Sequence, residues 1–557
     1  MPSRNEIVAQ FTREGPFELV EDSSLGYPIK LYRHAPPNMR AILEATRPFD
    51  DRVFLVYNDE EITYREHFRR VAALARALHA RGVRKGDRIA IGMRNYPEWV
   101  ISFWACQAIG AVVVAINAWW TGDEIQYALK DSGASVLLID GERLARLRSI
   151  IDLGGFRCVI VARRGDVEGP GVDFAEVTTG DGPLPAADIQ PDDPATILYT
   201  SGTTGKPKGA VATQRNHITN FMNTMLAGAV GKALLGDFSA LPPSQMPQGS
   251  ALQTFPFFHI GGLTGLYAST GTGSKLVLMY KWNAAEALEL VMKHGIAAVS
   301  GVPIVVRQLL EAAAQLGVNP SSIMGISAGG ASVPPDLIQR IEGQFEAKAS
   351  ATNGYGLTET TSAVIVNAGQ EYFAHPDSVG RPVATAQVEI VDEQGRFLGD
   401  NEIGELWVRG PNVVEGYWGN PEATEAAFGG GWFRTGDLGY RDSDGFYYVV
   451  DRKKDVIIRG GENVYCAEVE AQILVHPLVR DAAVIGLPDP VYGERVAAVI
   501  QIDELAAADD LQAALMVMLA ERLARFKVPT VYHFMQTELP RTATGKVLKR
   551  ELRAVFE

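Results

Sequence analysis

The sequence predicts an α/β protein: a large N-terminal domain of layered α/β subdomains plus a small β unit, followed by a small mobile α+β C-terminal domain. Helical and strand patterns alternate through the first half, short β-rich runs begin near Ser378, and the pattern changes again at Ile457. Such alternation is typical of helices packed on a parallel sheet. The 557 residues suffice for roughly three to five folding units.

The first half supplies the clearest single elements. Apolar residues recur at helical spacing from Thr63 to Gly82, and a strand pattern at 88–93 follows a short turn. The same order recurs, as helix 123–131 before strand 135–139 and helix 284–294 before strand 297–300.

One apolar stretch, Ile101 to Trp120, approaches the length of a membrane span. It is interrupted by Ser102, Gln107 and Asn117, and Gly110 lies near its middle. We interpret it as a buried helix that passes through a glycine turn into a buried strand.

The sequence pattern of the second half of the chain predicts shorter elements. Residues 234–253, rich in Pro, Ser, Gly and Gln, predict a mobile surface loop. No internal repeat is found. The C-terminal elements are strands 482–486 and 496–502, an amphipathic helix 511–526 and a last strand 531–534.

Composition limits the function classes. The 46% hydrophobic and 21% charged residues argue against a disordered chain or a coiled coil. The net charge of −14 disfavours nucleic acid and anionic lipid as partners, so an anionic ligand needs a local site. Cys106, Cys158 and Cys466 are too few for a disulfide framework or metal cluster. The N-terminus shows no secretory signal, and we expect a cytoplasmic protein without a transmembrane span.

The strongest motif is Tyr199 to Ala210, YTSGTTGKPKGA, directly after a buried strand pattern. Its glycines, hydroxyls and lysines can offer backbone N–H groups and positive charge to a polyphosphate. The Walker A spacing is absent, because Gly202 and Gly205 lie too close together and Pro207 follows Lys206. The alternative interpretation is a solvated Gly/Ser/Thr linker.

Three weaker motifs follow. In TNGYGLTET the glycines around Tyr355 allow close approach of a planar ligand, and Glu359 offers hard oxygens to Mg²⁺. In WFRTGDLG, Asp437 stands at a predicted tight glycine turn and can accept ribose hydroxyls, unless it is a solvated hairpin residue. The charged run Asp451–Gly461 suggests a hinge, unless it is a solvated face. Lys546 in PRTATGKVLKREL follows a glycine turn and could project toward a site on another domain; the alternative is the start of a basic C-terminal helix.

Together, in this order, these motifs closely resemble the adenylate-forming superfamily of acyl-CoA synthetases, adenylation domains and beetle luciferases, over roughly Glu61 to Arg550. The resemblance implies that a carboxylate attacks the α-phosphorus of ATP, pyrophosphate leaves, and a thiol then displaces AMP. The implied cofactors and substrates are ATP, Mg²⁺, coenzyme A and a small-molecule carboxylic acid. A homodimer is left open as the assembly.

The resemblance also assigns residues. Lys546 would bridge carboxylate and α-phosphate, Glu359 would bind Mg²⁺, and Asp437 with Arg452 would hold the ribose. The residues expected to take part in catalysis are Lys546, Thr204, Glu359, His259 and Lys454. Those expected to bind cofactors are Thr200, Ser201, Gly202, Thr203, Thr204, Gly205, Lys206, Lys208, Gly330, Ala331, Ser332, Asn353, Gly354, Tyr355, Gly356, Thr358, Asp437, Arg452, Gly460 and Gly461.

By the same resemblance the chain divides near Lys454 into an N-terminal domain, 1–453, which includes a small β subdomain at 378–450, and a mobile C-terminal domain, 454–557. Rotation about Lys454 would withdraw Lys546 and bring the Gly460–Gly461 loop to the site for the thiol step. Ser332 and Cys466 stand where many relatives have Pro, which bears on the rigidity of those loops.

The acid pocket is expected around FPFFHIGGL, with His259 beside the acyl group; the alternative is an ordinary core histidine. Residues 251–282 contain no Asp or Glu, which favours an uncharged acyl tail. The prediction is an acid–CoA ligase for medium- or long-chain fatty acids or bulky apolar acids. The alternatives are an enzyme that loads a carrier protein, a ligase for aryl or steroid side-chain acids, and a nucleotide-binding regulatory protein without turnover.

Overall fold

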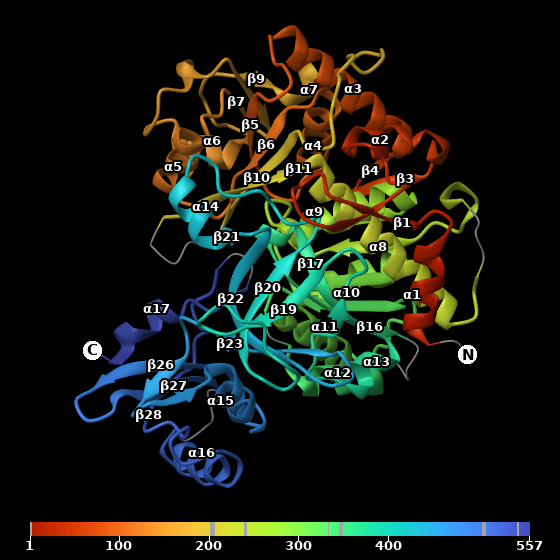
Figure 1. Cartoon of the computed structure of the whole chain (residues 1–557). Coiled ribbons are helices and arrows are strands. Elements are labelled where there is room, and N and C mark those ends of the chain that lie inside the picture. Colours follow the sequence, from red (N-terminus) through yellow and green to blue (C-terminus); the bar gives the residue numbers. More distant parts are fainter. Residues whose placement is uncertain are drawn as a thin grey trace.

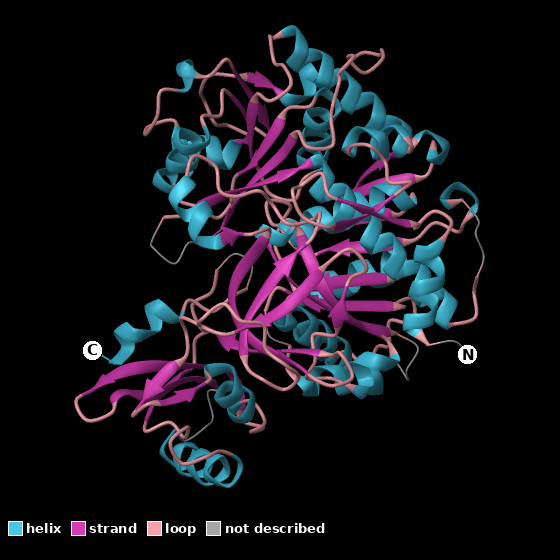
Figure 2. Ribbon diagram, viewed as in Figure 1, coloured by secondary structure: helices cyan, strands magenta, loops and turns pink. Residues whose placement is uncertain are grey.

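The computed structural model describes residues 3–200, 206–238, 242–331, 333–344, 349–503, 508–542 and 545–556. It shows a mixed α/β fold in which a large N-terminal domain precedes a small C-terminal domain, drawn in blue in Figure 1. Figure 2 shows helices gathered around the two large sheets of the N-terminal domain. The predicted fold class is therefore confirmed.

The first large sheet has seven strands, parallel except at one edge, where β11 runs antiparallel to β10. Its order is β11 (Lys208–Thr213), β10 (Pro194–Thr200), β6 (Val112–Ala115), β5 (Arg88–Gly92), β7 (Val136–Asp140), β8 (Cys158–Ala162) and β9 (Val172–Asp173).

The second large sheet has nine strands, with six parallel strands in its middle. Its order is β18 (Arg381–Pro382), β17 (Ser362–Ala368), β16 (Ser350–Leu357), β15 (Gly325–Gly329), β14 (Ala298–Gly301), β12 (Ser250–Gln253), β13 (Lys275–Leu278), β3 (Val53–Tyr57) and β4 (Glu60–Thr63).

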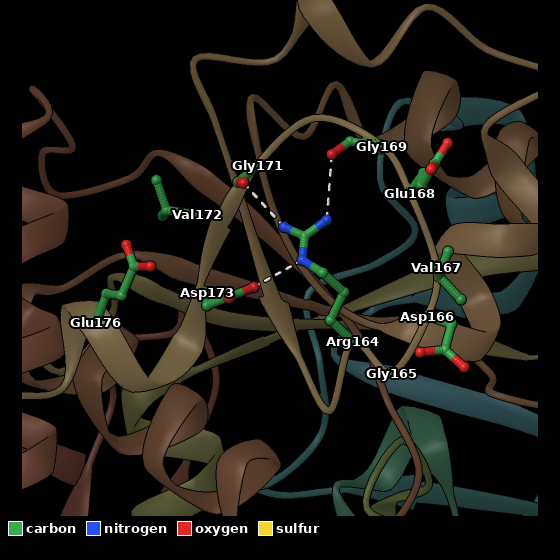
Figure 3. Close-up of a pocket in the computed structure, with 10 residues that line it drawn as sticks. All are labelled: Arg164, Gly165, Asp166, Val167, Glu168, Gly169, Gly171, Val172, Asp173 and Glu176. Carbon is green, nitrogen blue, oxygen red and sulfur yellow. Dashed lines mark hydrogen bonds and ion pairs between the residues drawn. The ribbon is translucent and has the colours of Figure 1, made fainter.

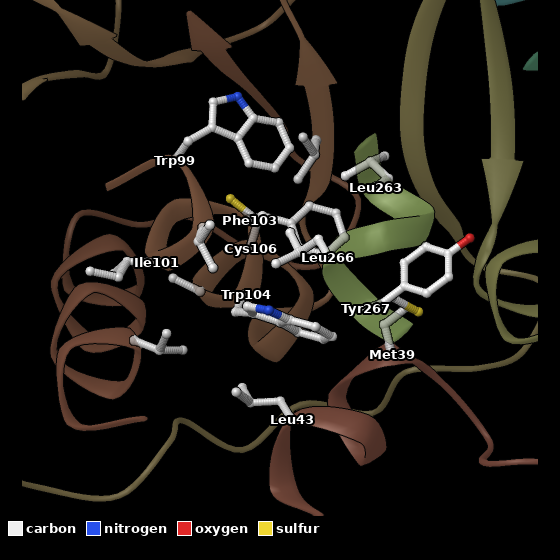
Figure 4. Packing of buried hydrophobic residues seen from close by; sticks show 14 of the residues in the cluster. Met39, Leu43, Trp99, Ile101, Phe103, Trp104, Cys106, Leu263, Leu266 and Tyr267 are labelled. Carbon is white, nitrogen blue, oxygen red and sulfur yellow. The ribbon is translucent and has the colours of Figure 1, made fainter. Parts of the chain in front are cut away.

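Buried helices join the two large sheets. Helix α4 (Pro97–Ile109) contacts β5 and β6 of the first sheet and β3 of the second. Its Trp99 and Trp104 pack with Tyr267 of α9 (Ile260–Thr272) and Met39 of α2 (Met39–Glu44) (Figure 4). This shared core fixes the two sheets against each other, so residues at their strand ends keep a fixed separation.

Other helices cover the outer faces. Helices α5 (Gly122–Ser132) and α6 (Gly141–Leu147) pack on the first sheet; α10 (Ala284–His294), α11 (Pro303–Gln315) and α12 (Pro335–Gln344) pack on the second. Further helices are α1 (Arg4–Arg13), α3 (Tyr64–Ala80), α7 (Phe174–Val177), α8 (Gln214–Leu234), α13 (Gln370–Ala374) and α14 (Pro421–Ala427), and β1 (Leu19–Asp22) pairs with β2 (Ile29–Tyr32).

Two smaller sheets complete the fold. The antiparallel β unit contains β19 (Gln387–Val391), β20 (Gly404–Arg409), β22 (Trp432–Arg441), β21 (Phe428–Gly429) and β23 (Tyr447–Arg452). The last sheet contains β25 (Glu462–Val464), β24 (Ile457–Arg459), β27 (Gly493–Ile502), β26 (Val479–Asp489) and β28 (Val531–Met535), with α15 (Cys466–Ile473), α16 (Ala508–Arg522) and α17 (Lys549–Leu552).

Most predicted elements are confirmed within a few residues. Thr63 caps α3 by accepting a hydrogen bond from Glu66 N, and the apolar stretch at 101–120 is α4, a left-handed Gly110 and β6. No helix in the described part of the chain is long and apolar enough to cross a membrane.

Two boundaries were wrong. The last four residues of the predicted loop 234–253 form β12, a strand too short to give a clear periodic pattern. The helix predicted at 511–526 begins at Ala508 and ends at Arg522; a separate turn follows it, closed by the bond from Lys527 N to the Ala524 carbonyl (2.8 Å), and the Phe526 carbonyl accepts a hydrogen bond from Arg459 Nη1.

Candidate functional site

The candidate site lies along one edge of the nine-stranded sheet. Strands β12, β14, β15 and β16 are parallel neighbours, so the residues that follow them meet at their shared carboxyl edge. Phe255 follows β12, Val302 follows β14 and Gly330 follows β15, while Tyr355 lies near the end of β16. A Cβ added to Gly330 would lie 3.6 Å from Val302 and 3.8 Å from Phe255.

Strand β16 carries four of the predicted binding residues. Asn353 is buried and pairs with Ala328, and Gly354 pairs with Gly329 of β15. Gly356 lies at a register shift, and Thr358 starts a 3₁₀ turn that ends at Thr360. Ala331 and Gly330 follow the neighbouring strand, so the structure brings these residues together; Ser332 lies outside the described residues.

Asp437 lies inside strand β22, not at the tight turn that the sequence predicted. Gly436 has φ +73° where the pairing with β20 shifts register, so a β-bulge redirects the following side chain. Asp437 is only 4% exposed, which excludes the solvated hairpin alternative.

Both oxygens of the Asp437 carboxylate are engaged. Tyr355 Oη donates a 2.8 Å hydrogen bond to Oδ2, and Arg452 Nε lies 3.2 Å from Oδ1. Burial raises the pKa of Tyr355 well above its usual value, and the negative charge of Asp437 adds to the shift. Each carboxylate oxygen can accept a second hydrogen bond, so hydroxyls of a ligand can still bind there.

The glycine-rich motif joins β10 to β11 at the edge of the first sheet, where Thr200 pairs with Lys208. Its lysines lie over aromatic rings: Lys206 Nζ is 5.5 Å from the Tyr127 ring centre and Lys208 Nζ is 5.1 Å from that of Tyr417. The predicted residues Ser201, Gly202, Thr203, Thr204 and Gly205 lie outside the described residues.

Glu359 is buried and takes a 2.8 Å hydrogen bond from the Tyr417 hydroxyl. Burial raises the pKa of Glu359, and the Tyr417 hydrogen bond opposes that shift. Because Tyr417 also lies under Lys208, one aromatic ring connects the carboxylate to the glycine-rich motif. A single hard carboxylate near the glycine-rich motif fits Mg²⁺, which binds through one or two carboxylates plus substrate phosphates.

Lys546 reaches this site from the C-terminal domain. It follows Gly545 in a hairpin turn closed by the bond from Thr542 N to the Lys546 carbonyl (2.8 Å). Burial, together with the nearby Arg452 guanidinium, lowers the pKa of Lys546 to about 8, and the Asp437 carboxylate opposes this shift. A Cβ added to Gly545 would come within 2.8 Å of Val302, so the turn rests against the carboxyl edge of β14.

The residues predicted to act in the domain rotation are Lys454, whose charge acts on Lys546, and Gly460 and Gly461. Lys454 is exposed in the turn between β23 and β24. Gly460 N donates to the Tyr492 carbonyl (2.8 Å), and a Cβ added to Gly461 would have no neighbour within 4 Å. In this arrangement the positive charge of Lys546 interacts with the Asp437 carboxylate.

His259 caps helix α9, where its Nδ1 accepts a hydrogen bond from Gly261 N (3.2 Å). Its ring stacks on Phe255, with centres 5.8 Å apart and planes inclined by 16°. Burial lowers the pKa of His259 to about 4, so the ring is neutral at pH 7. Since Phe255 borders Val302 and Gly330, the histidine forms part of an uncharged aromatic wall beside the cluster around Lys546.

A shallow hollow of about 580 Å³ lies elsewhere, around the loop that leads into β9 (Figure 3). Arg164 occupies it and binds the carbonyls of Gly169 and Gly171 and the carboxylate of Asp173. The Arg164 guanidinium therefore stabilises the loop at residues 164–173. No residue of the predicted site lines this hollow.

Sequence reasoning missed Tyr417. Its only local signal is an aromatic residue between Gly416 and Trp418, which does not distinguish a site residue from a core residue. Its partner Glu359 lies 58 positions earlier, and the strand order that brings the two together is not visible in either segment.

Comparison with known proteins agrees with this geometry. A family model described as "AMP-binding enzyme" matches residues 43–418, and one described as "AMP-binding enzyme C-terminal domain" matches residues 468–546. A 2-succinylbenzoate–CoA ligase of Bacillus velezensis is 34% identical over 90% of this chain and 95% of its own. A feruloyl-CoA synthase of Amycolatopsis sp. is 35% identical over 89% of this chain and 94% of its own.

Solved structures match over nearly the whole chain. The o-succinylbenzoate CoA synthetase of Bacillus subtilis with its acyl-adenylate intermediate has a TM-score of 0.77, 31% identity, and coverage of 93% of this chain and 98% of that one. The same protein was solved with ATP and magnesium ion. An anthranilate CoA ligase with anthranoyl-AMP has a TM-score of 0.83, 26% identity, and coverage of 93% and 97%.

Proposed function

Because the chain belongs to the AMP-binding enzyme family and is an AMP-forming acid–thiol ligase, we propose that it joins a carboxylic acid with an uncharged aromatic or similarly bulky apolar tail to coenzyme A. The observation that carries this proposal is the position of Lys546. This partly buried cation from the C-terminal domain lies within electrostatic reach of Asp437 and Arg452, and the preceding Gly545 rests against Val302, which borders Phe255.

The first half-reaction brings two anions together. Two unit charges ~4 Å apart repel by roughly 4 kcal/mol at an effective dielectric constant of about 20, so cations must lie where the negative charge accumulates. Protonated Lys546 would contact the carboxylate and the α-phosphate as the new C–O–P linkage forms and pyrophosphate leaves. Lys206 and Lys208 would hold the outer phosphates. Mg²⁺ bound at Glu359 would neutralise phosphate charge.

Asp437 would fix the nucleotide. Tyr355 and Arg452 already hold its carboxylate in one orientation, so the ribose hydroxyls would meet prearranged acceptors. The ring of Tyr355 and the backbone of Gly330 and Ala331 would border the adenine.

The second half-reaction needs Lys546 to leave. We place the hinge at Lys454, between an N-terminal domain of residues 1–453 and a C-terminal domain of residues 454–557. Rotation there would bring the Gly460–Gly461 turn to the site, where the CoA thiolate displaces AMP from the acyl carbon. The open surroundings of Gly461 and the exposure of Lys454 are consistent with such a movement.

The residues of the aromatic wall, Phe255 and His259, support some classes of acid over others as the substrate. Phe255 and neutral His259 give an aromatic, uncharged surface, which disfavours a second carboxylate and suits stacking of an aryl ring. Relatives named for succinylbenzoate, ferulate and anthranilate support aryl acids ahead of the fatty acids that the sequence analysis placed first. Succinylbenzoate is itself a diacid, so the preference for a single carboxylate rests on Phe255 and His259 alone. A Mycobacterium tuberculosis fatty acyl CoA synthetase, 28% identical, keeps fatty acids as the second candidate.

A pyrophosphate-release screen tests the proposal. Aryl acids such as ferulate and anthranilate, fatty acids and steroid-like acids are each supplied with ATP, Mg²⁺ and either CoA or a pantetheinylated carrier protein. We expect CoA-dependent turnover. It should be fastest with an aryl acid whose ring carries no second charged group, and slower with an aryl diacid. Thioester formed only on the carrier protein, or no pyrophosphate exchange with any acid, would contradict it.

A further inference from the structure

The buried carboxylate of Asp451 joins the two sides of the proposed hinge. Asp451 lies in strand β23, three residues before Lys454, and is 8% exposed. Its Oδ1 accepts a 2.7 Å hydrogen bond from Arg452 N. Its Oδ2 accepts a hydrogen bond from the backbone N–H of Cys466, which is the first residue of helix α15, on the other side of the hinge.

Helix α15 lacks a cap of its own. Its N-cap residue Tyr465 makes no side-chain hydrogen bond to the first turn. The first N–H groups of a helix need an acceptor, and an anion near this end is favoured by the helix dipole. Asp451 supplies both, so a residue of the small β unit caps a helix of the C-terminal sheet.

The same carboxylate faces the segment that carries Lys546. Lys549, three residues after Lys546, forms a 2.7 Å ion pair with Glu470 of α15, and its positive charge acts on Asp451. Asp451 therefore contacts α15 directly and lies near α17, the short helix that follows the Lys546 turn.

We propose that Asp451 is a positioning residue that caps α15 across the hinge and thereby favours the arrangement in which Lys546 faces Asp437. This inference rests on the proposed hinge at Lys454. Rotation there would separate β23 from α15 and break the hydrogen bond, so the bond stabilises only one of the two arrangements. Asp451 would favour the adenylating step without touching a substrate.

Substitutions at Cys466 can separate the effect of its backbone N–H from that of its side chain. Cys466→Ala keeps the backbone donor and removes the thiol, whose Sγ lies 3.0 Å from the Asp455 carbonyl. Cys466→Pro removes the donor, and Pro is favoured at the first position of a helix. Tyr465 is already extended (φ −84°, ψ 117°), as a residue before Pro must be. Asp451→Ala and Asp451→Asn remove the acceptor and its charge, respectively.

Two measurements test whether the hydrogen bond from Cys466 N to Asp451 favours the adenylating arrangement. The first is hydrogen exchange of peptides covering residues 452–465 without ligand. The second compares pyrophosphate exchange with thioester formation from a supplied acyl-adenylate. We expect Cys466→Pro and Asp451→Ala to exchange faster and to lose about tenfold in pyrophosphate exchange, the size expected for one hydrogen bond to a charged group. Thioester formation should be unchanged or faster. Cys466→Ala should match the parent, and Asp451→Asn should fall between.

Other outcomes overturn the inference. If Cys466→Pro matches Cys466→Ala in both half-reactions and in exchange, the bond does not set the arrangement. If both half-reactions fall equally, Asp451 has a purely structural role. If the parent enzyme performs neither half-reaction with any acid, the proposed function has failed, and hydrogen exchange alone then decides: faster exchange in Cys466→Pro supports the cap, and equal exchange refutes it.

Discussion

Lys546 should set the alkaline limit of adenylation. Its pKa is about 8 without ligands, and only the protonated amine can offset the charge of carboxylate and phosphate. Because kcat/KM reports the free enzyme, kcat/KM for ATP in pyrophosphate exchange should fall as pH rises through about 8. Lys546→Arg should be slower but should lack this fall, since the guanidinium stays charged. The same alkaline fall in the Arg variant would assign it to another group.

Tyr417 should set the acid limit through Glu359. Tyr417→Phe keeps the ring under Lys208 but removes the hydroxyl that opposes the raised pKa of Glu359. The acid limb of kcat/KM should therefore move to higher pH, and the Mg²⁺ concentration for half-maximal rate should rise about five- to tenfold. Tyr448→Phe, which loses a comparable bond to Asp442 away from the site, is the control. Equal Mg²⁺ dependence in both variants would show that the Tyr417 hydroxyl does not influence Mg²⁺ binding at Glu359.

At the scale of elements, the bulge in β22 should matter for nucleotide binding beyond its effect on stability. Gly436 and Gly445 both have positive φ (+73° and +82°), and an added Cβ would meet no neighbour within 4 Å at either. Alanine at each should therefore cost a similar ~1 kcal/mol of unfolding free energy, from backbone strain alone. Only Gly436→Ala should raise KM for ATP, because only Gly436 directs Asp437. Equal KM values in the two variants would show that the bulge does not orient the carboxylate.

Elements whose signals are local were predictable from sequence. The cap at Thr63 and the break at Gly110 act within a few residues, and the order of the motifs gave the family. Contacts that depend on strand order were not predictable. The pairs Tyr417–Glu359 and Tyr355–Asp437 span 58 and 82 positions, and the cap from Asp451 to Cys466 crosses the proposed hinge at Lys454. Neither partner of such a pair carries a local pattern that identifies the other.

At the scale of the whole molecule, three sheets and the C-terminal domain all contribute to the candidate site. The seven-stranded sheet ends in the glycine-rich motif, the nine-stranded sheet provides the pocket wall and Glu359, and the β unit provides Asp437. The C-terminal domain adds Lys546, the part that we propose leaves between the half-reactions. Because Lys546 lies on a different domain from the other candidate site residues, we predict that mutation can separate the two half-reactions.

The most direct test measures both half-reactions of Lys546→Ala, with the exposed Lys281→Ala as control. Pyrophosphate exchange should fall by about a hundredfold or more, the usual cost of removing one group that stabilises transition-state charge, while a supplied acyl-adenylate is still converted to thioester at the parent rate. An equal loss in both half-reactions, or no loss in the first, would contradict the account.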